Sequence, residues 1–157
     1  MFQTRLQYFN LIVPLFVLSC AGDRTGDTAI RTEVANAMER YMVAARAVDA
    51  DAIASFFTER GMLFEPGVMP IQTRDTIRAF MASFPGVRVD SAIVLPDTIE
   101  VFGGTAFVWG SYFERLAFPG QPASEQRGRF VMEWVRQPNG EWLIHRYFRV
   151  PISTLTF

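Results

Sequence analysis

Alternating apolar and polar residues near the C-terminus predict a β-hairpin. Two aromatic-rich runs, 129–135 and 142–148, flank the dipeptide Asn139-Gly140. Asn and Gly tolerate the positive φ angles of the tight turns that join antiparallel strands. Both faces of each predicted strand carry bulky apolar side chains, because successive residues point to opposite sides. We therefore expect helices to cover one face of the sheet and a partner, such as a second subunit, to cover the other.

Upstream of these strands, apolar residues recur at the 3.6-residue spacing of amphipathic helices. The predicted helices are 28–48, 49–61 and 73–84. Asp49 and Thr73 have side chains that cap helix N-termini, and Gly61 suits the left-handed residue that closes a helix. A short predicted strand, 62–65, separates the second helix from the third.

The rest of the chain before the hairpin is predicted to be strand. The segments are 88–95, 98–102 and 105–118. Pro96-Asp97 predicts a bend or bulge, and Gly103-Gly104 a tight turn. Helices segregated on one face of an antiparallel sheet define an α+β domain. We expect a cone-shaped α+β barrel, with three N-terminal helices packed on a strongly curved, mainly antiparallel sheet. The open end of such a cone commonly holds a small ligand.

The first twenty residues have the pattern of an export signal. Arg5 precedes an apolar run, 11–18, which is too short to span a bilayer. Residues 17–20, Val-Leu-Ser-Cys, resemble the bacterial lipobox, whose Cys becomes the lipid-modified first residue of the mature protein. The predicted organisation is a signal peptide at 1–19, lipidated Cys20 and a tether at 20–27, one domain at 28–152, and a tail at 153–157.

This organisation predicts a protein anchored in a membrane of the bacterial cell envelope, on the periplasmic or cell-surface side. The anchor would be the lipid on Cys20. An ordinary secretory peptide and an uncleaved membrane anchor are the alternatives.

Composition excludes several kinds of chemistry. All fifteen basic residues among the 157 are Arg, so no Lys is available to form a Schiff base. The formal net charge is −1 and the cations are scattered, unlike the basic stripe of a nucleic-acid-binding protein. Cys20 is the only Cys and His145 the only His, which argues against a metal site. We expect no metal and no cofactor.

The order of elements and four short motifs resemble the nuclear transport factor 2-like superfamily, specifically its SnoaL-like and ketosteroid-isomerase-like branch. The resemblance covers nearly all of residues 29–150. The matching motifs are 40–41 (Arg-Tyr), 49–53 (Asp-Ala-Asp-Ala-Ile), 64–67 (Phe-Glu-Pro-Gly) and 140–142 (Gly-Glu-Trp). Because the superfamily includes enzymes, ligand binders and association modules, the resemblance implies a fold more than a function.

The resemblance also implies site residues. In ketosteroid isomerases, an acid before a Pro moves a proton, while a tyrosine and a second, protonated acid stabilise the oxyanion. When this chain is aligned with ketosteroid isomerases without gaps, Glu65 matches the acid that moves the proton and Tyr41 matches the tyrosine. Met132 matches the second acid, and a methionine side chain cannot donate a hydrogen bond. Glu65 is thus the implied base, with Tyr41 or His145 as its electrophilic partner. The same match directs eight implied ligand-binding residues toward the cavity: Trp109, Ser111, Phe113, Phe130, Met132, Trp134, Tyr147 and Arg149.

Each implied catalytic residue also has a structural interpretation. Glu65 could lie at the mouth, cap a backbone group or pair with an Arg such as Arg149. Tyr41 could be a core tyrosine, and His145 a packed strand residue.

Three functions stay open from the sequence. The favoured one is a module that binds a small hydrophobic or amphipathic ligand, because the oxyanion site is incomplete. The second is a cofactor-independent acid–base enzyme, such as an isomerase, cyclase or dehydratase, that uses Glu65. The third is an association module that forms a homodimer through the outer face of its sheet.

Overall fold

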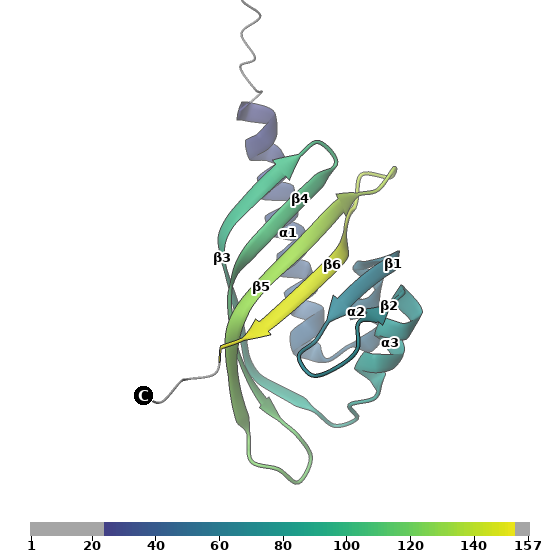
Figure 1. Ribbon diagram of the computed structural model, residues 1–157, viewed down its shortest axis with the longest axis vertical. Helices are drawn as coiled ribbons and strands as arrows, with labels where there is room; N and C mark the ends of the chain where they lie inside the picture. The colour runs from purple at the N-terminus through teal and green to yellow at the C-terminus, as the bar shows by residue number, and fades with distance from the viewer. Residues whose placement is uncertain (1–23, 153–157) are drawn as a thin grey trace, which may run out of the picture.

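The computed structural model describes residues 24–152, which form three helices and six strands (Figure 1). The helices are α1 (Arg24–Ala47), α2 (Ala50–Ser55) and α3 (Arg74–Ala82). The strands are β1 (Phe57–Phe64), β2 (Ile71–Gln72), β3 (Arg88–Phe102), β4 (Thr105–Ala117), β5 (Ser124–Arg136) and β6 (Trp142–Pro151).

The six strands form one curved, unclosed sheet in the order β2-β1-β6-β5-β4-β3. Only β1 and β6 pair in parallel within the described sheet, and the other neighbouring strands are antiparallel. The sheet is therefore mixed. The helices lie on one side of it, with α1 running behind the long strands and α2 and α3 beside β1 (Figure 1). The predicted α+β cone is confirmed.

The core lies between α1 and the concave face of the sheet. Val34, Tyr41 and Met42 of α1 are buried there with residues of β4, β5 and β6, because one stripe of the helix is apolar. The largest fully buried sheet residues are Phe57, Leu63, Val108, Phe130, Met132, Trp134 and Ile144. The helices therefore cover the concave face of the sheet and leave its convex face on the outside of the molecule.

The local signals for helix and strand ends were mostly correct. The Asp49 side chain accepts a hydrogen bond from the Ala52 backbone N–H, and Thr73 caps α3 in the same way through Thr76. Gly140 adopts the positive φ expected in the β5–β6 turn. The pairing of β3 with β4 shifts between Pro96 and Thr98, as the predicted bulge requires.

Several boundaries differ from the prediction. The second helix ends at Ser55, and Gly61 lies inside β1 rather than at a helix end. A Cβ on Gly61 would lie 3.0 Å from the Phe57 Cβ, so this glycine allows a close approach inside an irregular strand. The first helix begins at Arg24, so residues 24–27, predicted as tether, are helical.

The predicted signal peptide, Cys20 and the tail at 153–157 lie outside the described residues. Among the helices of residues 24–152, none is long and apolar enough to cross a membrane.

Candidate functional site

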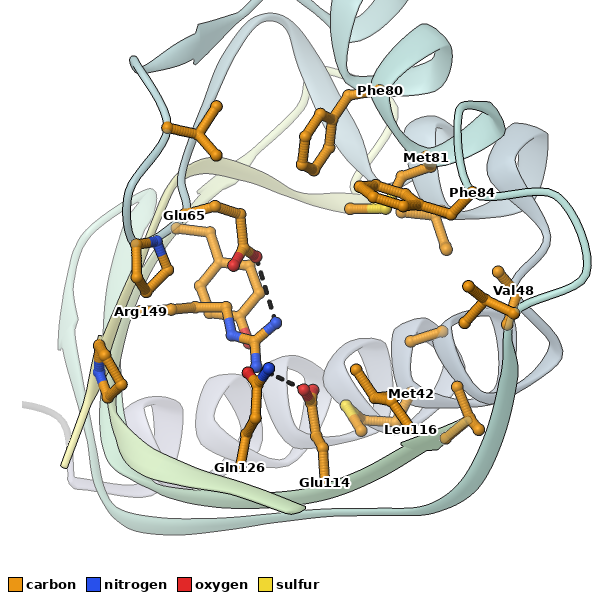
Figure 2. A pocket seen from close by; sticks show the side chains of 18 of the residues that line it. Met42, Val48, Glu65, Phe80, Met81, Phe84, Glu114, Leu116, Gln126 and Arg149 are labelled. Atoms are coloured by element: carbon orange, nitrogen blue, oxygen red, sulfur yellow. Dashed lines mark hydrogen bonds and ion pairs between the residues drawn. The ribbon is translucent and has the colours of Figure 1, made fainter. Parts of the chain in front are cut away.

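A cavity of about 450 Å³ opens between the C-terminal half of α1, helix α3 and the ends of the long strands (Figure 2). Its wall is divided into an apolar part and a polar part. The apolar part includes Met42, Val48, Phe80, Met81, Phe84, Leu116 and Phe118. The polar part consists of Tyr41, Glu65, Glu114, Gln126, Tyr147 and Arg149. The cavity therefore matches an amphipathic molecule in its distribution of polarity.

Arg149 is the centre of the polar part. It donates from Nη1 to Glu65 Oε1 at 3.2 Å and from Nη2 to Glu114 Oε2 at 2.5 Å (Figure 2). The side chains of Arg149, Glu65 and Glu114 are only 13%, 16% and 17% exposed. The Arg149 guanidinium carbon lies 4.4 Å from the centre of the Tyr112 ring, within cation–π range. These contacts join β6, β4 and the segment after β1 at one point.

Each of these elements positions its charged residue for a local reason. Glu65 directly follows β1 and precedes Pro66, where the chain leaves the sheet. Glu114 shares a face of β4 with Tyr112, and Gly128 of β5 pairs directly with Tyr112. A Cβ on Gly128 would lie 2.7 Å from the Tyr112 ring. Glycine at this position therefore makes room for the ring that lies under Arg149.

Burial changes the acid–base properties of the polar groups. It raises the pKa of Glu65 above its ordinary value, and the ion pair with Arg149 opposes that shift. Burial also raises the pKa of the Tyr41 and Tyr147 hydroxyls. Both hydroxyls therefore stay protonated at neutral pH and can donate hydrogen bonds. Their rings meet edge to face, with centroids 6.0 Å apart.

The structure brings four of the predicted site residues together. Glu65, Tyr41, Tyr147 and Arg149 all line the cavity. The predicted ligand-binding residues Phe130, Met132 and Trp134 are fully buried in the core instead of lining it.

The predicted orientation of Trp109, Ser111 and Phe113 toward the cavity is wrong. These residues pair with Val131, Arg129 and Arg127, which lie on the opposite face of β5 from Phe130. The concave face of β4 carries the intervening residues instead, including Val108, Tyr112 and Glu114. Alternation along β4 separates its two faces but does not identify the inner one. The gapless alignment with ketosteroid isomerases was shifted by one residue in this strand and so selected the outer face.

His145, one of the two implied electrophilic partners of Glu65, does not line the cavity. The pairing of β5 with β6 shifts between Glu133 and Trp134, next to His145, and this irregularity turns His145 away from the cavity. His145 Nδ1 lies 3.0 Å from the Thr58 hydroxyl. It lines a separate polar hollow with Thr58, Glu59, Arg60, Arg74 and Gln137.

Sequence analysis missed Glu114 and Gln126. Glu114 is the only charged residue in 105–114, an otherwise apolar and aromatic segment. A charge in such a strand needs a partner if it is buried, and that signal could have identified Glu114. Within residues 24–152, no group of three His, Cys, Asp or Glu residues is arranged to hold a metal ion.

Comparisons with known structures support the fold. A ketosteroid isomerase-like protein from Erwinia carotovora atroseptica is 18% identical, with a TM-score of 0.71 over 78% of this chain and 96% of that one. A nuclear transport factor 2-like superfamily protein from Salmonella enterica is 15% identical, with a TM-score of 0.70 over 82% of this chain and 95% of that one.

A third similar structure is a nuclear transport factor 2-like protein with a cystatin-like fold from Novosphingobium aromaticivorans. It is 20% identical, with a TM-score of 0.66 over 83% of this chain and 91% of that one. Similarity at this level of identity establishes the fold alone. A search of curated proteins found no match.

The family model of the SnoaL-like domain matches residues 27–147, which include nearly all of the described fold and three of the four residues that meet in the cavity, Tyr41, Glu65 and Tyr147. The chain therefore belongs to the SnoaL-like domain family, and it has the fold of nuclear transport factor 2-like proteins.

Proposed function

We propose that this domain binds a small amphipathic molecule. The observation that carries the proposal is the division of one cavity into an apolar wall and a polar end. The apolar body of the ligand would displace water from Phe80, Met81 and Leu116, which stabilises the complex through the hydrophobic effect. Its polar head would lie beside Arg149 and the two carboxylates.

Binding without turnover is favoured over catalysis by the state of Glu65. One of its oxygens accepts a hydrogen bond from Arg149, so Glu65 would have to weaken an ion pair to act as a base. Met132 is buried and cannot replace the missing oxyanion donor. His145 lies outside the cavity.

The acid–base enzyme is kept as a second candidate for one reason. Tyr41 and Tyr147 are protonated hydroxyl donors beside Glu65 in the same cavity. If such an enzyme activity exists, Glu65→Gln removes it for every responsive carbonyl substrate. If binding is the function, the variant still binds ligand and no turnover is found.

Binding is tested by filling the cavity. Purified protein is examined by native mass spectrometry for co-purifying molecules, and binding of decanol is measured by calorimetry. Leu116→Trp places an indole in the apolar part of the cavity and is expected to weaken decanol binding at least about tenfold. Val43→Trp, on an α1 residue that is 61% exposed, is the matched control. Equal binding by both variants would contradict the proposed site.

We also propose that lipidated Cys20 anchors the domain in the cell envelope. The support is the lipobox-like sequence at 17–20 after a short apolar run. Labelled palmitate is expected to enter the full chain produced in bacteria, and Cys20→Ser is expected to prevent labelling and release the protein from membranes. Unlabelled wild-type protein would refute the anchor and leave the binding proposal intact.

A further inference from the structure

The polar end of the cavity has an excess of negative charge. Glu65 and Glu114 face a single guanidinium, so two carboxylates against one cation leave a formal charge of −1. The three side chains are each less than one fifth exposed, and solvent therefore screens this charge poorly.

Each carboxylate also has a free acceptor. Arg149 occupies Glu65 Oε1 and Glu114 Oε2, and the other two oxygens have no hydrogen-bond partner among residues 24–152. The Arg149 Nε is buried away from solvent and has no acceptor among the described residues, so it is not offered to a ligand. The cavity thus presents carboxylate acceptors while its one cation is already engaged on both sides.

We propose that the cavity selects amphipathic molecules whose polar head is a cation, such as an alkylammonium group. The inference rests on the proposed binding function and names its ligand class. An ammonium head would donate hydrogen bonds to the free oxygens of Glu65 and Glu114 and neutralise the excess charge.

An anionic head would be bound poorly for the opposite reason. To reach Arg149, a ligand carboxylate would have to displace Glu65 or Glu114 from its ion pair. The displaced side chain would then be an unpaired charge in a largely dehydrated cavity, which is strongly unfavourable. A neutral head avoids this repulsion but leaves the excess charge without a partner.

The preference should depend on pH through Glu65. The groups facing it are Arg149 and Tyr147 from β6, Glu114 and Tyr112 from β4, and Tyr41 from α1. Burial raises the pKa of Glu65, so acidification protonates it and reduces the charge of the cluster from −1 to zero. The cation preference is therefore expected to weaken as pH falls through this pKa.

Three probes with the same alkyl chain distinguish a failure of the proposed cation preference from a failure of the proposed binding function. Decylamine, decanol and decanoate are titrated by calorimetry at neutral pH, below the concentrations at which they form micelles. The amine is expected to bind at least about tenfold more tightly than the alcohol, and decanoate more weakly than the alcohol. Equal binding of amine and alcohol, or tightest binding of decanoate, overturns the inference alone. No binding of any probe overturns the binding function and the inference with it.

Two substitutions locate the effect. Glu114→Gln removes the excess charge. It is expected to abolish most of the amine advantage, defined as the tighter binding of decylamine than of decanol, while decanol still binds. Glu39→Gln makes the same change of charge at an exposed α1 residue and is expected to retain the advantage. If Glu114→Gln does not fold, Glu65→Gln serves the same purpose, and the wild-type comparison requires no variant. An amine advantage that survives loss of the carboxylate contradicts the proposed site.

Discussion

Arg149 is the residue on which the polar part of the cavity depends. It separates Glu65 from Glu114, binds both, and lies over the face of Tyr112. Removing one partner of a buried ion pair leaves an uncompensated charge, which costs far more than the pair itself contributes. Here two carboxylates would lose their partner at once.

Arg149→Met is therefore expected to lower the free energy of unfolding by about 3–5 kcal/mol at neutral pH. Urea denaturation measures the loss, which should shrink at acidic pH as Glu65, whose pKa is raised by burial, becomes protonated. The control is Arg129→Met. Arg129 pairs with Asp97 on the outer face, where both side chains are 47% exposed, and its loss should cost no more than about 1 kcal/mol. Equal losses in the two variants would show that the cavity cluster is solvated like a surface pair.

Glu65 makes the stability of the protein depend on pH. Its pKa in the folded protein is raised above 4.5, so the folded state holds this proton more tightly than the unfolded state does. The resulting contribution to stability is fully present at pH values below the ordinary pKa. It is lost as pH rises through the raised pKa of the folded state.

Glu65→Gln removes this titration. Between about pH 4 and pH 7, the wild type is expected to lose stability relative to the variant, measured as the difference in their melting temperatures. Glu39→Gln, at an exposed position, should give a difference that does not change over the same range. A wild type that gains stability relative to Glu65→Gln with rising pH would mean that the Arg149 pair outweighs burial.

At the scale of elements, close packing of β5 against its neighbours positions Arg149 and its aromatic support. Gly128 pairs with Tyr112 on one side and Pro151 on the other. A Cβ at this glycine would lie 2.2 Å from the Val150 carbonyl oxygen and 2.7 Å from the Tyr112 ring. The strands and the ring would both have to move.

Gly128→Ala is expected to destabilise the domain by about 1–3 kcal/mol, because overpacking forces backbone and side-chain shifts. It should also displace the Tyr112 ring, which NMR would detect as a change in the ring resonances. Gly104→Ala is the control, since nothing lies within 4 Å of a Cβ there and its φ is not in the left-handed region. Similar effects of both changes would contradict the tight fit at Gly128.

On the scale of the whole molecule, the outer face of the sheet is apolar and uncovered. Phe64 and Phe148 stack there with ring centroids 4.1 Å apart, beside Val131 on β5. Two ion pairs, Arg129–Asp97 and Arg146–Glu133, lie among the apolar side chains. Paired charges around an apolar centre suit contact with an identical surface, because a two-fold interface repeats the same patch on both partners.

The whole molecule is accordingly expected to form a homodimer through this face, with a second copy as the occupant. Sedimentation of the wild type should give a dimer, and Val131→Arg should shift it to a monomer. Val131 is 40% exposed, and Val43→Arg on α1, which is 61% exposed, introduces the same charge away from the sheet. A monomeric wild type would refute the dimer.

The sequence by itself determined most of the elements of this protein and its family. Several local features depend only on residues close together in the sequence, so they could be predicted without knowledge of the fold. They are the apolar stripes of the helices, the capping side chains of Asp49 and Thr73, and the Asn139-Gly140 turn. The resemblance that implied Glu65 and Tyr41 as site residues depends on the order of these elements, and both residues line the cavity.

Tertiary structure alone decided which face of β4 points inward and which carboxylate joins Glu65 at Arg149. It also decided where the pairing register of β6 with β5 shifts, which exchanges the faces of the residues that follow in β6. Each of these features depends on the register between strands that are distant in the sequence, and a shift of one residue moves every side chain to the opposite face. Trp109 and His145 were therefore assigned to the cavity in error, while Glu114 was missed.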